Sequence, residues 1–116
     1  MYRVIKIGDK EVPMLSMASV DVYYKRVFRE DPLIKLADKD DDNAAKVSLA
    51  FPMGFIMAKF AELKDRKKMM QLTEDDYLDW LDQFEYGDYV EAAADIILTY
   101  YGQKAGSAHE KNAVRQ

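Results

Sequence analysis

The residues best placed to do chemistry are three aspartates in the run DKDDDN, residues 38–43. Asp38, Asp40 and Asp42 match the first, third and fifth ligand positions of an EF-hand calcium loop. The match fails at the sixth position, where Asn43 replaces the turn-forming glycine, and at the twelfth, where Leu49 replaces the bidentate glutamate. Because a cation would lose its anchoring pair of oxygens, we interpret the run as a solvated acidic loop that would bind Ca²⁺ or Mg²⁺ weakly at most.

Other residue types used in catalysis are present without the surroundings that catalysis needs. The single histidine, His109, lies in a polar, unpatterned C-terminal stretch, where nothing would orient it as a general base. Paired carboxylates such as Asp75 and Asp79 fall on the solvent side of an expected helix, where neither burial nor a fixed partner would shift their pKa values. The five glycines form no phosphate-binding loop. We therefore expect no enzyme activity, no cofactor and no metal.

Composition limits the class of protein. The chain has 116 residues, 49% hydrophobic and 33% charged, which is typical of one globular domain. It contains no cysteine, which is common in reducing compartments. Charged residues interrupt the N-terminus, and the longest apolar run, residues 47–61, contains Pro52 and Lys59 and is short for a membrane span. We expect a soluble, cytoplasmic protein that does not contact a membrane.

Charge is distributed unevenly along the chain. Residues 72–102 contain nine acidic side chains and no Lys, Arg or His, whereas the densest basic cluster is KDRKK, residues 64–68. Such a chain is a poor nucleic-acid binder. The acids alternate with large rings, which indicates either an amphipathic helical pair with a solvated acidic side or an acidic, partly apolar surface that binds another polypeptide.

The periodicity predicts an α+β fold that is predominantly α-helical. An N-terminal β-hairpin, residues 2–15 with its turn at Gly8, is expected to pack on a bundle of about four helices. The helices are expected over about 19–31, 43–65, 73–85 and 88–101. Together they form one domain, residues 1–102, followed by a flexible tail, residues 103–116.

Particular residues are expected to define the helix boundaries. Ser19 is a suitable N-cap for the first helix, which Pro32 would end, and Pro52 should kink or interrupt the long second helix. Thr73 and Asp88 are expected to cap the last two helices, and Gly102 to stop the final one. The expected buried stripe of helix 73–85 is Tyr77, Trp80, Leu81 and Phe84. The expected buried stripe of helix 88–101 is Val90, Ala93, Ala94, Ile97 and Tyr101.

The central helix carries more large apolar residues than one buried stripe requires. Seven methionines in so short a chain also favour an adaptable contact surface, although filling gaps in a core is their commoner use. We therefore take Phe51, Met53, Phe55 and Met57 as candidate partner-binding residues.

Three stretches, followed by the polar tail, resemble one protein family in content and order: IGDKEVPMLSMASVDVYYKRVFREDPL, GFIMAKFAE and YLDWLDQFEYGDYVEAAADIILTYYG. They are similar to the tail assembly chaperones of long-tailed bacteriophages, and of prophages in Gram-positive bacteria. The resemblance covers roughly residues 3–102. The acidic run DKDDDN and Pro52 depart from the family pattern, and no residue-level binding motif is carried over from the family.

The resemblance implies a mostly helical, non-catalytic protein with a transient role in building a phage tail. Such a protein binds the apolar tape measure protein and keeps it soluble in the host bacterial cytoplasm until tail tube subunits polymerise, and it is absent from the mature virion. A longer product, made by ribosomal frameshifting, would recruit tail tube protein, and this chain would be the shorter form. Since many weak copies along a rod give avidity, we also expect self-association.

Two alternatives come from other classes of protein. Residues 72–102 could act as an acidic decoy that blocks a nucleic-acid-binding host protein, and such a complex should dissociate steeply with added salt. A weak Ca²⁺-responsive adaptor would instead have a melting temperature that changes when a chelator is added.

Overall fold

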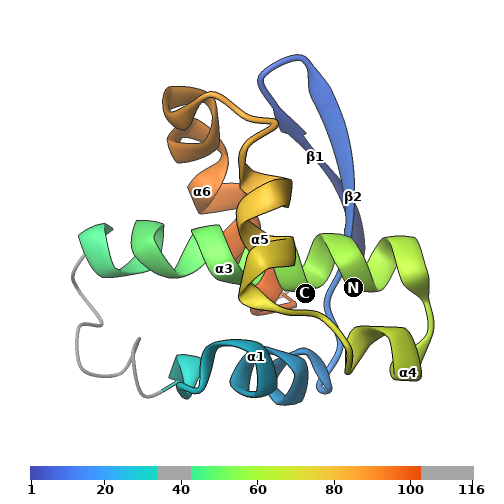
Figure 1. Cartoon of the computed structure of the whole chain (residues 1–116). Helices are drawn as coiled ribbons and strands as arrows, with labels where there is room; N and C mark the ends of the chain where they lie inside the picture. Colours follow the sequence, from blue (N-terminus) through green and yellow to red (C-terminus); the bar gives the residue numbers. More distant parts are fainter. Residues whose placement is uncertain (34–42, 103–116) are drawn as a thin grey trace, which may run out of the picture.

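The computed structural model describes residues 1–33 and 43–102, which form a hairpin followed by helices (Figure 1). The elements in order are β1 (Tyr2–Ile7), β2 (Lys10–Leu15), α1 (Val20–Phe28), α3 (Asn43–Leu63), α4 (Arg66–Met69), α5 (Glu74–Leu81) and α6 (Tyr86–Tyr100). The predicted α+β, mainly helical class and the N-terminal hairpin are confirmed. The candidate ligands Asp38, Asp40 and Asp42, together with His109 and the predicted tail, lie outside the described residues.

The hairpin is antiparallel, with a register that runs from Tyr2 opposite Leu15 to Ile7 opposite Lys10. Gly8 has a φ of +65°, the left-handed conformation that the sequence predicts for the turn. Alternation along the strands places Ile5, Ile7 and Met14 in the core. One face of the hairpin therefore packs against the hydrophobic core.

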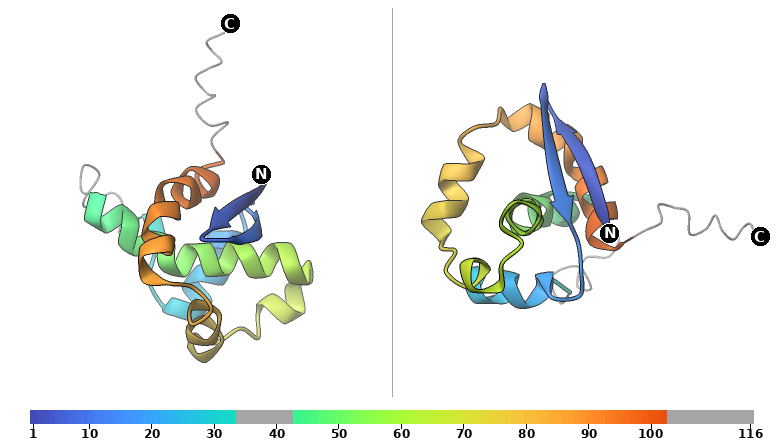
Figure 2. Two further views of the ribbon diagram at one scale, coloured as in Figure 1. Left: turned by 90° about the horizontal axis from the view of Figure 1, so that it is seen from above. Right: turned by 90° about the vertical axis from the view of Figure 1, so that its right-hand side faces the viewer.

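Helix α3 runs through the middle of the described structure. Seen nearly end-on, it is surrounded by α1, α5, α6 and the hairpin (Figure 2). It continues through Pro52, so of the two predicted effects, a kink or an interruption, the interruption is wrong. Proline in a helix interior costs about 3 kcal/mol, and packing on several sides of α3 offsets that loss.

Helix α3 is also long and apolar enough, by length and composition only, to cross a membrane: Ala44–Leu63 has a hydropathy of 1.3. The expectation that no segment reaches this length is therefore wrong. The core position of the helix accounts for its composition, because Leu49, Ile56 and other side chains on it are completely buried.

Several helix boundaries differ from prediction. Helix α1 ends before Arg29, which has a φ of 60° and donates its N–H to the Lys25 carbonyl, so Pro32 is not the stop. Ser19 makes no side-chain capping hydrogen bond. Helix α6 begins at Tyr86 rather than after Asp88. The short helix α4 was not predicted.

The start of α5 and the end of α6 match the sequence signals. Thr73 accepts a hydrogen bond from the Asp76 N–H at 3.2 Å, and Asp76 Oδ2 accepts one from the Thr73 N–H at 2.9 Å, which completes a capping box. Trp80 is buried, with the other three residues of the predicted stripe half-buried beside it. Gly102, with a φ of +67°, follows α6 as predicted.

Candidate interaction surface

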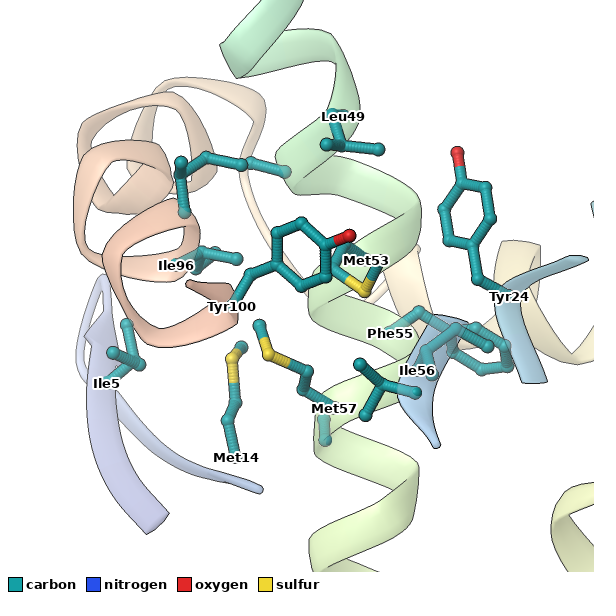
Figure 3. Close-up of a cluster of buried hydrophobic side chains, with 14 of the residues drawn as sticks. Ile5, Met14, Tyr24, Leu49, Met53, Phe55, Ile56, Met57, Ile96 and Tyr100 are labelled. Atoms are coloured by element: carbon teal, nitrogen blue, oxygen red, sulfur yellow. The ribbon is translucent and has the colours of Figure 1, made fainter. Parts of the chain in front are cut away.

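Three of the four predicted partner-binding residues lie in the core. Met53, Phe55 and Met57 have no exposed surface, and Figure 3 shows Met57 directed toward Met14 while Phe55 lies on the side of Tyr24. Because α3 is covered on several sides, it needs more than one apolar stripe, and the surplus that suggested a binding surface is core packing. The prediction that Met53, Phe55 and Met57 form an exposed binding surface is therefore corrected: in this fold they are core residues.

Phe51, the fourth residue, is half-buried within a stack of aromatic rings. Its ring centroid lies 4.4 Å from that of Tyr89 and 5.7 Å from that of Tyr86, both in stacked geometry. Tyr86 is 73% exposed as a residue, the largest exposed fraction among the exposed large apolar residues of the described chain. An exposed ring held against a half-buried one resembles the aromatic anchors of protein interfaces.

Helix α6 has two apolar sides. Its core side consists of Tyr89, Ala92, Ala93, Ile96, Ile97, Thr99 and Tyr100, so the predicted buried stripe was rotated by about one residue. Ala93 and Ile97 of that predicted stripe are buried, whereas Val90 is half-buried, and Ala94 and Tyr101 are exposed. The second apolar side runs along the helix at intervals of three or four residues through Tyr86, Val90, Ala94, Leu98 and Tyr101.

Two grooves lie beside the first turns of α3. One, of about 570 Å³, lies against α6 and is lined by Lys46, Val47, Val90, Glu91, Ala93, Ala94, Ile97, Leu98 and Tyr101. The other, also of about 570 Å³, is lined by Ala44, Val47, Ser48, Phe51, Tyr77 and Tyr86. Val47 lines both, so the two grooves adjoin at this residue. We call these lining residues together the α3–α6 surface.

Buried hydrogen bonds hold α6 in place against α3. The Tyr89 hydroxyl donates toward the carbonyl oxygens of Ala50 and Phe51, at 2.9 and 3.0 Å. Burial raises the pKa of Tyr89 well above its ordinary value, so this donor keeps its proton. One wall of the α3–α6 surface is therefore fixed to the other at Phe51.

The C-terminal end of α6 is tied to two other elements. The Tyr100 hydroxyl donates to Asp21 Oδ1 at 2.7 Å, and the Ser16 hydroxyl donates to the Tyr100 carbonyl at 2.9 Å. Burial, and next the hydrogen bond to Asp21, raise the pKa of Tyr100. These bonds connect α6 to the first turn of α1 and to the residue after β2.

Acidic side chains follow one edge of α6. Glu91 is exposed and lines the groove against α3, and Asp95 lies one turn further along and is also exposed. Asp95 pairs with Arg3 of β1 at 3.5 Å, with both groups partly in solvent, so the bond contributes little to stability. The wall formed by α3 contributes a single charged residue to the groove, Lys46.

A basic surface lies over α1 and α4, which are in contact through a hydrogen bond from Arg26 Nε to the Met70 carbonyl at 2.8 Å. Its exposed members are Lys25, Arg26, Arg29, Lys64, Arg66, Lys67 and Lys68. Exposed basic residues are thus concentrated on α1, α4 and the residues beside them, where Glu30 and Asp65 are also exposed, whereas α5 and α6 contain no basic residue.

The part of the chain that the structure describes contains no group of three or more His, Cys, Asp or Glu residues that could hold a metal ion. Leu49, at the position where an EF-hand has its bidentate glutamate, is completely buried in the core. Sequence reasoning missed Tyr86 and Leu98 as surface residues, although their spacing along α6 was a usable signal. Comparison of the chain with protein-family models, curated proteins and solved structures found no match.

Proposed function

We propose that this chain is a tail assembly chaperone, which binds the tape measure protein of a phage or prophage and keeps it soluble until the tail tube polymerises. The observation that carries the proposal is the apolar α3–α6 surface, which is open along α6 and holds the exposed ring of Tyr86. The resemblance over residues 3–102 supplies the identity of the partner.

The surface suits a reversible cover for an apolar rod. Its grooves are open to solvent, which favours weak contacts that can be displaced, and the aromatic stack at Phe51 gives each contact a rigid anchor. Many copies bound along one rod would gain avidity while each copy stays exchangeable. The chaperone would act in the host cytoplasm and leave before the virion is complete.

Self-association belongs to the same proposal. The basic residues on α1 and α4 and the acidic residues on α5 and α6 give one molecule two surfaces of opposite sign. Neighbouring copies on a rod would attract one another through such surfaces, and salt would weaken that attraction. Sedimentation of the free protein at low and high salt tests this part.

Co-expression tests the proposal. The long helical open reading frame downstream of this gene should yield an insoluble product alone and a soluble complex when this chain is present. Purified virions should contain the tape measure protein without stoichiometric amounts of this chain. A tape measure that stays insoluble, or a virion that retains the chain, would overturn the proposal. A slippery heptanucleotide in the encoding DNA would indicate the longer form that recruits tail tube protein.

One observation favours the acidic decoy as a second candidate. Glu74, Asp75, Asp79, Asp82 and Glu85 are all exposed along α5 and the residues after it. A decoy complex depends on these charges, so it should dissociate as salt rises, whereas apolar contacts should persist. Retention of the tape measure fragment on the immobilised chain at high salt separates the two functions.

A further inference from the structure

We propose that the α3–α6 surface binds one amphipathic helix of about three turns, with lysine or arginine along the flank that faces the acidic edge of α6. This inference deepens the proposed function, on which it rests for the identity of the protein that supplies the helix. It specifies the conformation, the length and the charge pattern of the bound segment.

The walls of the groove favour a helical occupant. Both walls are helices whose interior N–H and C=O groups pair within the helix, so they offer no backbone partners to an extended peptide. A helix satisfies its own backbone groups and needs only side-chain contacts. Ala93 and Ala94 line the groove with small side chains, which let another helix approach closely.

The apolar side of α6 sets the length of the occupant. The groove residues Val90 to Tyr101 are eleven helical steps apart, or about 16 Å at 1.5 Å per step, which is about three helical turns. Tyr86 and Tyr101 stand at the two ends of the stripe, with 73% and 49% of their surfaces exposed. Tyr101 would contact one end of the bound helix, and Tyr86 lies one turn beyond the other end, in the adjoining groove.

The charged residues beside the groove determine which side of the bound helix should carry cations. Glu91 lines the groove and Asp95 follows it one turn later on the same edge of α6. Helix α6 has no basic residue in its last turn, so its negative C-terminal pole adds to the field at that end. Asp95 already pairs with Arg3, and Lys46 lies on the opposite wall, so a bound helix gains from cations on the side next to Glu91.

Synthetic peptides of about 14 residues test the inference with the full chain. The first carries leucine and alanine on one face and lysine on its flanks; the second replaces every lysine with glutamate; the third scrambles the first, so that it keeps the charge and loses the apolar face. Nuclear magnetic resonance titration gives the affinity and the residues affected. We expect the lysine helix to bind, with shifts at residues 44–51 and 86–101, and the other two to bind about tenfold more weakly or worse.

Variants locate the site. The double change Ala94→Gln and Leu98→Gln should weaken binding of the lysine helix about tenfold. Leu78→Gln is the matched control, because Leu78 is 54% exposed on α5 and lines neither groove, so this change should leave the affinity unchanged. Glu91→Gln should reduce the preference for the lysine helix over the glutamate helix. Unchanged melting temperatures show that the variants are folded.

Three results would overturn the inference: equal affinity for the lysine and glutamate helices, shifts confined to other elements, or a surface already occupied by a second copy of this chain. The two proposals fail separately. If the wild-type chain solubilises the tape measure but binds no lysine helix, the inference fails and the proposed function stands. If the lysine helix binds at the surface but the tape measure stays insoluble, the proposed function fails.

Discussion

The hydroxyl of Tyr89 occupies the space in which a side chain at residue 54 would begin. A Cβ atom added to Gly54 would collide with the Tyr89 oxygen, while the next ring atom, Cζ, would lie at a tolerable 3.4 Å. The glycine therefore lets the tyrosine hydroxyl reach the carbonyl oxygens of Ala50 and Phe51 on α3. This contact lies beside Pro52, where the helix lacks one backbone hydrogen bond.

The first prediction concerns this pair. Gly54→Ala should lower the free energy of unfolding by about 1–3 kcal/mol, because the added methyl group forces Tyr89 to move. In a Tyr89→Phe background, Gly54→Ala should lower the free energy of unfolding much less. The tyrosine oxygen that the new methyl group would meet is then absent, and alanine is a better helix former than glycine.

Chemical denaturation of the two single variants and the double variant gives the coupling energy. We expect a coupling of more than about 1 kcal/mol, as contacting residues usually show. Additive losses would mean that Gly54 and Tyr89 do not compete for this space.

The second prediction concerns the bond between Tyr100 and Asp21. Tyr100→Phe removes the donor to Asp21 Oδ1 and should lower the free energy of unfolding by about 1.5–3 kcal/mol, the range for hydrogen bonds to charged groups. Tyr101→Phe is the control, because that ring is half exposed and should change stability little. Equal effects of the two changes in urea denaturation would contradict the structural role of the bond.

The third prediction concerns alkaline pH. Burial raises the pKa of Tyr77 from 10.0 to about 12, and burial also raises those of Tyr24, Tyr89 and Tyr100. Above pH 10 the unfolded chain loses these protons while the folded chain keeps them, so the free energy of unfolding must fall as pH rises. Below pH 10 this contribution is fully present.

Melting temperatures measured from about pH 8 to pH 11 test this prediction. Between about pH 8 and pH 10 these tyrosines should not affect the melting temperature, which should then decrease above about pH 10. Ultraviolet absorbance should show that some tyrosines ionise only at a higher pH than the others. Ionisation of all the tyrosines near pH 10 without unfolding would show that the four side chains are not protected.

Local signals made much of the fold predictable. The turn at Gly8, the N-cap Thr73 and the stop at Gly102 each depend on residues close in sequence, and each is confirmed. Arg29 shows the limit of that reasoning, because a non-glycine residue in the left-handed conformation ends α1 without a sequence signal.

The surface was harder to predict, because both helices that form it are apolar on more than one side. Periodicity finds the stripe of an amphipathic helix but cannot say which of two stripes faces the core. On α3 the surplus apolar residues Met53, Phe55 and Met57 pack inside, whereas on α6 the predicted buried residues Val90 and Ala94 line a groove. Only the tertiary arrangement decides between these assignments.

The fourth prediction tests the central claim, that the α3–α6 surface covers the tape measure protein. Hydrogen exchange should be measured for this chain alone and in complex with a purified tape measure fragment, with mass spectrometry to locate the protected amides. We predict added protection concentrated in residues 44–51 and 86–101, and its loss in the Ala94→Gln, Leu98→Gln variant. Protection confined to the hairpin or to α1 and α4, or no complex at all, would contradict the account.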